Sequence, residues 1–157
     1  MLIIIQSGQT GVERGAYRAA QTAGLQLAGF MPMDGRDELG KIPEQVAQYL
    51  TPCFERGPRP AVRANVALAS GVLLVVPDAR QADKYTAMTA TLKTARNLTV
   101  PRKICDSTSD VDEVVAWARK LPETSGSVRI MVTGPRETRW KEGEAVARRL
   151  VTAIAMT

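Results

Sequence analysis

Short apolar runs alternate with helical patterns along the whole chain. The runs at 2–5, 72–76 and 128–132 consist mainly of Ile, Val, Leu and Met, and shorter strand-like runs lie at 26–29 and 103–105. Strands that are nearly continuous in apolar residues are typical of a parallel sheet whose two faces are both covered by helices. The sequence therefore predicts a buried sheet of about five strands.

Apolar and small residues at helical spacing separate these runs. They predict helices over 12–23, 43–50, 61–69, 86–98, 109–121 and about 141–155. We expect Ser109 to cap the fifth helix, because Asp112 follows three residues later, and Gly15 to let the first helix press against the sheet. Alternating strands and helices are joined by right-handed crossovers. The expected fold class is α/β: a doubly wound, mainly parallel Rossmann-like sheet with helices on both faces, in a single domain over 1–157.

Composition removes several kinds of chemistry. The chain contains no histidine, which excludes serine–histidine and cysteine–histidine catalysis and most zinc sites. Its two cysteines, Cys53 and Cys105, form no CxxC pair and no other metal-ligand spacing. We therefore expect no metal that is held by protein ligands.

The chain is basic, with 21 Lys and Arg against 16 Asp and Glu, a net charge of +5. Arginine recognises phosphates, but a GC-rich genome also raises the arginine content, so charge alone decides nothing. No basic segment precedes the first apolar run, and no run approaches the ~18 apolar residues of a membrane span. We expect a cytoplasmic protein that does not enter a membrane.

The loop after the first strand reads Ser7-Gly8-Gln9-Thr10-Gly11. Glycine lets a ligand approach the backbone closely, and a turn that leads into a helix points N–H groups at an anion. Thr10 adds a hydroxyl, Gln9 adds an amide, and Arg14 follows on the helix. The loop predicts a site for an anionic, nucleotide-like ligand, although a tight strand-to-helix turn explains the same glycines.

A second glycine turn, Gly134-Pro135-Arg136-Glu137, follows the last strand. Arg136 is a candidate to close over an anion at the same edge of the sheet. Glu137 is a candidate to accept a hydrogen bond from a sugar hydroxyl or a base amino group. The alternative is a surface turn with a solvated ion pair.

The middle of the chain offers weaker candidates. Arg36 and Arg63 are possible anion ligands, and Asn65 is a possible reader of a base edge or a ribose. Thr86 and Thr89 begin the helix after the third strand, where Thr86 can bind a phosphate or simply cap the helix. A solvated loop charge explains Arg36 at least as well, an ordinary place on a helix surface explains Asn65, and capping is the favoured explanation of Thr86.

Five pieces of sequence follow one another in an informative order. They read SGQTGVER at 7–14, GFMP through IPE at 29–44, RANV at 63–66, TAMT at 86–89 and GPRET at 134–138. This order resembles the molybdenum carrier family, in the circularly permuted branch of the SLOG superfamily of Rossmann-like domains. The resemblance implies a bound cofactor, either molybdenum cofactor, a pterin bearing a phosphate, or a nucleotide derivative. It also implies a homo-oligomer, a dimer or a tetramer.

The chain departs from that family's pattern at four places. Ser7 stands where the family has a first glycine, and Glu13 stands where it has an aspartate. The segment 77–85 contains no glycine, although family members have a glycine-rich run there, and 67–71 lacks their aspartate. A glycine-poor loop cannot cradle a phosphate through its backbone in the same way. The ligand therefore stays open between molybdenum cofactor and a nucleotide signal.

Three functions remain in competition. The first is a non-catalytic binding protein that carries or sequesters a phosphorylated nucleotide-like ligand. The second is a nucleotide hydrolase of phosphoribohydrolase type, in which Glu137 or Glu13 serves as the acid or base; the PGGxGT signature of such enzymes is absent. The third is nucleic-acid binding, which the scarcity of aromatic residues near the basic clusters makes weaker.

Overall fold

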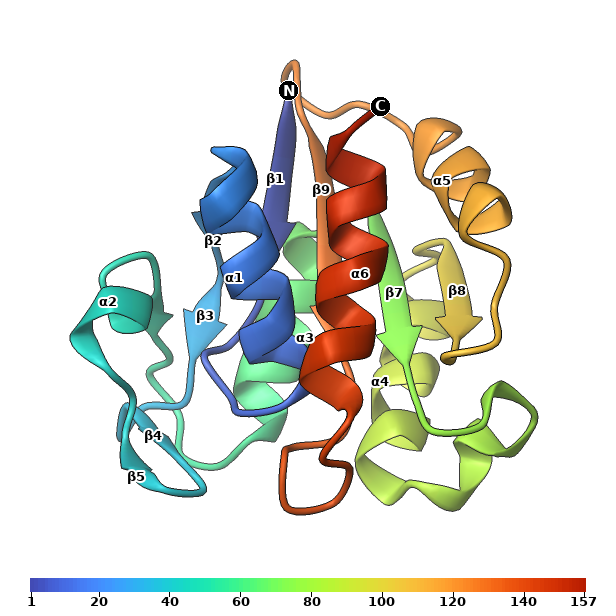
Figure 1. Cartoon of the computed structure of the whole chain (residues 1–157). Helices are drawn as coiled ribbons and strands as arrows, with labels where there is room; N and C mark the ends of the chain where they lie inside the picture. The colour runs from blue at the N-terminus through green and yellow to red at the C-terminus, as the bar shows by residue number, and fades with distance from the viewer.

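The computed structural model describes residues 1–157 as three layers, with a sheet between two layers of helices (Figure 1). The sheet has five strands in the order β2-β1-β9-β7-β8, and every neighbouring pair is parallel. The strands are β1 (Leu2–Ile5), β2 (Gln26–Ala28), β7 (Gly71–Val75), β8 (Arg102–Cys105) and β9 (Val128–Thr133). The predicted α/β class, with a parallel Rossmann-like sheet, is confirmed.

Helices cover both faces of this sheet. One face carries α1 (Val12–Ala23), α5 (Val111–Arg119) and α6 (Gly143–Ala155), and the other carries α3 (Arg59–Leu68) and α4 (Thr86–Asn97) (Figure 1). No helix combines the length and the apolar character that crossing a membrane requires.

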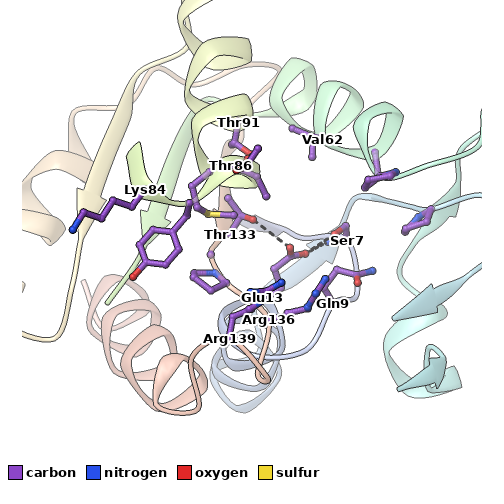
Figure 2. Close-up of a pocket in the computed structure, with 18 residues that line it drawn as sticks. Ser7, Gln9, Glu13, Val62, Lys84, Thr86, Thr91, Thr133, Arg136 and Arg139 are labelled. Atoms are coloured by element: carbon purple, nitrogen blue, oxygen red, sulfur yellow. Dashed lines mark hydrogen bonds between the residues drawn. The ribbon is translucent and has the colours of Figure 1, made fainter. Parts of the chain in front are cut away.

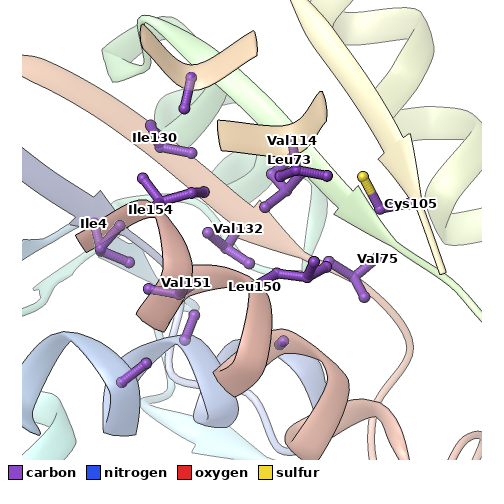
Figure 3. Packing of buried hydrophobic residues seen from close by; sticks show 14 of the residues in the cluster. Ile4, Leu73, Val75, Cys105, Val114, Ile130, Val132, Leu150, Val151 and Ile154 are labelled. Atoms are coloured by element: carbon purple, nitrogen blue, oxygen red, sulfur yellow. The ribbon is translucent and has the colours of Figure 1, made fainter. Parts of the chain in front are cut away.

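Two hydrophobic clusters hold the layers together. Ile4, Leu73 and Val132 belong to the cluster under α1, α5 and α6 (Figure 3), whereas their neighbours Ile5 and Val72 belong to the cluster under α3 and α4. Successive residues of a strand point to opposite faces, so a strand buried on both sides must be apolar throughout. This explains why the strands are nearly continuous in apolar residues.

Several small elements in the long loops were not predicted. They are β3 (Phe30–Met31) paired with β6 (Thr51–Pro52), the hairpin of β4 (Arg36–Asp37) and β5 (Gly40–Lys41), and the 3-10 helix η1 (Ala79–Lys84). The helix α2 (Glu44–Ala47) is shorter than the expected 43–50. Two-residue strands are too short to produce a periodic pattern.

Two local predictions were wrong. Asp110, not Ser109, caps α5: its carboxylate accepts the N–H of Asp112, while the Ser109 hydroxyl accepts the N–H of Asp106 at 2.9 Å. Gly15 faces α6 rather than the sheet, because a Cβ there would lie 2.2 Å from the carbonyl oxygen of Glu144. The absent side chain lets the two helices cross closely.

The strand order creates a switch point between β7 and β9. The chain leaves β9 for α6 on one face and leaves β7 for α4 on the opposite face, although the two strands are neighbours in the sheet. Gly134 follows β9 and packs against β7, where a Cβ would lie 2.1 Å from the carbonyl oxygen of Val75. Diverging connections leave a crevice beyond the carboxyl ends of the strands.

Candidate functional site

A cavity of about 500 Å³ opens at this crevice. Its lining comes from the loops after β1 and β9, the start of α3, and the segment that joins η1 to α4 (Figure 2). Ligands of open α/β sheets bind at this place in the fold, and the volume lies in the usual range for small-molecule sites. The cavity is therefore the candidate functional site.

A buried carboxyl group lines the cavity. Glu13 is the second residue of α1, and it is 7% exposed. Its Oε1 accepts hydrogen bonds from the Ser7 N–H at 2.7 Å and the Ser7 hydroxyl at 2.6 Å. Its Oε2 accepts one from the Thr133 hydroxyl at 3.2 Å, so the carboxyl bridges the ends of β1 and β9 (Figure 2).

The environment of Glu13 makes its proton harder to lose. Burial raises the pKa of the carboxyl above its ordinary value of 4.5, and the hydrogen bonds from Ser7 and Thr133 oppose this effect only in part. A buried carboxyl that faces a cavity can exchange a proton with a ligand or accept a hydrogen bond from it.

The walls of the cavity are partly apolar. Ala61 and Val62 line it from α3, and Met88 lines it from α4. Tyr85 lies just before α4, and the buried Thr91 lies one turn beyond Met88. Apolar walls around a few polar groups are typical of sites that bind a small organic molecule.

Three cations line the same cavity, and we call them the basic rim: Lys84, Arg136 and Arg139. All three are exposed. Arg136 pairs with Glu38, with 3.2 Å between Nε and Oε2. Lys84 and Arg139 form no ion pair within the chain. Their charge is available to an anionic ligand.

Glu38 joins the β4–β5 hairpin to both glycine loops. Its carboxylate accepts hydrogen bonds from the hydroxyls of Thr10 and Thr138, and from the Thr138 N–H at 3.3 Å. Burial acts to raise the pKa of Glu38, but these hydrogen bonds and the charge of Arg136 outweigh it and hold the pKa below its ordinary value. The ionised carboxylate therefore fixes the position of Arg136 at the basic rim.

Six of the residues that the sequence assigned to the site line the cavity. They are Ser7, Gln9, Thr86, Gly134, Pro135 and Arg136. Thr86 is the first residue of α4 and does not cap it, because the N-cap position belongs to Tyr85.

Five more assigned residues lie beside the cavity without lining it. The glycines shape the loops: the Gly8 N–H donates to Gln6 Oε1 at 2.6 Å, and a Cβ on Gly11 would lie 2.6 Å from the carbonyl oxygen of Pro135. The Thr10 hydroxyl accepts the N–H of Glu137 at 3.1 Å, while the Glu137 residue is exposed. The Thr89 hydroxyl is 3.2 Å from the carbonyl oxygen of Asp83, to which it donates.

The four remaining assignments do not line the cavity, and we leave them out of the site. Arg14 donates to the Gly8 carbonyl and pairs with Asp37, both at 3.0 Å. Arg36 is exposed on the hairpin, and Arg63 pairs with Glu55 at the surface. Asn65 is fully buried and bonds to the backbone of Phe30.

Sequence reasoning missed several lining residues. Thr133 and Arg139 lie within five residues of Gly134, so widening the second glycine turn in both directions would have included them. Val62 and Met88 carry no comparable signal, because apolar residues on a helix normally indicate core packing. No group of three or more His, Cys, Asp or Glu side chains is arranged to hold a metal ion.

Comparison with known proteins agrees with this fold. The structure is similar to the crystal structure of "Putative molybdenum carrier protein" from Syntrophus aciditrophicus SB, with a TM-score of 0.80 and 19% identity over 97% of this chain and 93% of that chain. No curated protein matches the sequence. The model of the circularly permutated YpsA SLOG family matches residues 4–155. Because this match covers nearly the whole sequence, the chain belongs to the circularly permutated YpsA SLOG family.

Proposed function

We propose that this chain is a binding protein for a phosphorylated, nucleotide-like small molecule, which it carries or sequesters without transforming it. The observation that carries the proposal is the cavity at the switch point, with a hydrogen-bonding floor, apolar walls and a basic rim. Its volume of about 500 Å³ suits a ligand the size of a mononucleotide.

Each part of the cavity suits one part of such a ligand. A planar ring packs between Val62 of α3 and Met88 of α4. A phosphate is bound by Lys84 and Arg139, whose charges have no partner in the chain. Molybdenum cofactor belongs to this class of ligand, and the name of the Syntrophus protein supports its inclusion among the candidates.

Mass spectrometry of the purified protein tests the proposal directly. The protein is denatured, and released small molecules are identified. In parallel, nucleoside monophosphates and a phosphorylated pterin are added in a thermal-shift series. A ligand at 100 times its dissociation constant stabilises the fold by about 2.7 kcal/mol, which is easily measured. Absence of any co-purified ligand together with absence of any thermal shift contradicts the proposal.

A second candidate function is hydrolysis of a nucleotide at its N-glycosidic bond. The observation that favours it is Glu13, a buried carboxyl whose pKa is raised and which lines the cavity. Glu137, the other sequence candidate, is exposed and lies outside the lining. Release of free base from nucleoside monophosphates by the wild type, but not by Glu13→Gln, supports this function. Equal release by both proteins excludes a role for Glu13.

We also propose that the chain forms a homo-oligomer. Phe54 is 99% exposed and Leu39 is 74% exposed, and self-association removes such apolar side chains from water. Light scattering of the wild type and of Phe54→Ser tests this. A monomeric wild type contradicts the proposal.

A further inference from the structure

The chain itself uses the first hydrogen-bond donors of the loop that the sequence assigned to a ligand anion. The Ser7 N–H and the Ser7 hydroxyl both donate to Glu13 Oε1, at 2.7 and 2.6 Å. The Gly8 N–H donates to the side chain of Gln6 at 2.6 Å. The Glu13 carboxyl therefore occupies the place at the end of β1 where the loop sequence predicts an oxyanion.

A carboxylate has about four acceptor positions. Ser7 uses two on Oε1 and Thr133 uses one on Oε2, and only the weaker influence of the Gln9 backbone N–H acts on what remains of this cavity-lining carboxyl. A second anion here would lie beside a desolvated carboxylate, and like charges repel strongly where water is excluded. Protonation of Glu13 does not free the position at the end of β1 for an anion, because the carboxyl group still fills it and still accepts the Ser7 N–H.

The unpaired positive charge lies elsewhere in the cavity. Lys84 comes from the end of η1 and Arg139 comes from the loop after β9. In Figure 2 the Lys84 side chain stands well apart from the Glu13 carboxyl. A ligand that contacts both the basic rim and Glu13 must place its phosphate at the basic rim and a hydrogen-bond donor at Glu13.

Resting on the binding function proposed above, we infer that Glu13 determines specificity at this site. It accepts a hydrogen bond from a hydroxyl or amino group of the ligand, and it bars phosphate from the end of β1. The site then selects phosphate esters that carry a sugar hydroxyl or a base amino group, and it keeps bare oxyanions such as inorganic phosphate and molybdate away from the end of β1.

Calorimetric titration with inorganic phosphate, AMP and GMP tests the inference on four proteins: wild type, Glu13→Gln, Glu13→Ala and Glu123→Gln. The glutamine variant fills the same space without charge, so we expect nucleotide affinity to fall about tenfold while phosphate stays excluded. The alanine variant exposes the Ser7 donors, so we expect it to bind inorganic phosphate about tenfold more tightly than the wild type does. Glu123→Gln makes the same charge change at an exposed residue between α5 and β9, outside the cavity lining, and should match the wild type. Thermal melting confirms that each variant is folded, and Glu13→Gln alone tests the donor role if Glu13→Ala is unfolded.

Two results overturn the inference. One is phosphate binding by the wild type as tight as that by Glu13→Ala. The other is equal nucleotide affinity of the wild type and Glu13→Gln, which leaves the proposed function intact. If no nucleotide binds the wild type but Glu13→Ala gains phosphate binding, the proposed function fails while the exclusion of phosphate by Glu13 stands.

Discussion

Asn65 of α3 binds the backbone of Phe30 as a neighbouring strand would. Its side-chain carbonyl accepts the Phe30 N–H at 2.7 Å, and its side-chain amide donates to the Phe30 carbonyl at 3.0 Å. Phe30 begins β3, so a helix side chain supplies the pairing that this two-residue strand lacks on one side. The bond also fixes α3, whose first turns line the cavity with Ala61 and Val62.

We therefore expect Asn65→Ala to lower the free energy of unfolding by about 2 kcal/mol, because it leaves two backbone groups of Phe30 without partners in a partly buried place. The matched control is Arg63→Ala, two residues away on the same helix, which removes only an exposed ion pair with Glu55 and should cost about 0.5 kcal/mol or less. Urea denaturation measures both. A loss in Asn65→Ala as small as that in Arg63→Ala would contradict this role.

The main layers of this fold were predictable, and its long-range polar contacts were not. Strands such as β7, which has five buried residues in a row, can be predicted from their apolar composition. Asn65 does not, because its partner lies 35 residues away in a strand too short to produce a pattern. The contact of Glu13 with Ser7 could not be predicted either. An acidic residue is ordinary in a first helical turn, and nothing in the sequence indicates that its side chain folds back onto Ser7.

Arginine was the least predictable residue type. Arg14 and Arg136 both follow a glycine turn in the sequence, yet Arg14 is engaged by Asp37 away from the cavity, while Arg136 lines it. The difference arises from the β4–β5 hairpin, which presents Asp37 to one arginine and Glu38 to the other. No local sequence pattern predicts where a hairpin with strands of only two residues packs against the rest of the chain.

The close crossing of α1 and α6 predicts that Gly15→Ala changes the stability of the fold in the direction opposite to that expected from helix propensity. Replacing a helical glycine with alanine usually stabilises, by about 1 kcal/mol. For Gly15→Ala we instead expect a loss of about 2 kcal/mol, since the new Cβ would lie 2.2 Å from the Glu144 carbonyl oxygen and the helices must move apart. Thermal denaturation measures the change. Gly24→Ala, at the end of the same helix with nothing within 4 Å of the new Cβ but a φ of +69°, should cost about 1 kcal/mol. A stabilised Gly15→Ala would show that the crossing is loose.

Burial of Glu13 predicts a pH dependence of stability. The folded protein holds the Glu13 proton more tightly than the unfolded chain does, so this group lowers the free energy of unfolding as pH rises from about 4.5 through its raised folded pKa. The depressed pKa values of Glu38, Asp78 and Asp106 act below this window, where stability is lost as pH falls.

Urea denaturation of the wild type and Glu13→Gln between pH 4.5 and 8 isolates the effect. The difference in unfolding free energy should grow in favour of the variant as pH rises. A flat difference for Glu13→Gln means that its carboxyl is better solvated than its burial implies.

The ion pair of Arg14 and Asp37 should be worth far more than the pair of Arg63 and Glu55. The first pair has side chains 13% and 3% exposed, whereas the second has side chains 62% and 73% exposed. Asp37→Ala leaves the Arg14 charge buried without a partner, so we expect a loss of about 3 kcal/mol. Glu55→Ala should cost less than about 1 kcal/mol. Chemical denaturation of both variants checks the contrast, and equal losses would show that water reaches Arg14 freely.

The basic rim predicts how nucleotide affinity responds to charge and to salt. Each phosphate contact from Lys84 or Arg139 contributes a charge-assisted hydrogen bond, so Lys84→Ala and Arg139→Ala should each weaken nucleoside monophosphate binding at least about tenfold in calorimetric titrations. Arg119→Ala removes the same charge at the far end of α5, at the amino edge of the sheet, and should leave affinity nearly unchanged. Added salt should weaken binding by the wild type more than by either rim variant, because the contacts that salt screens are already gone in the variants. If Arg119→Ala weakens binding as much as Arg139→Ala does, the attraction comes from the net charge of +5 and not from the rim.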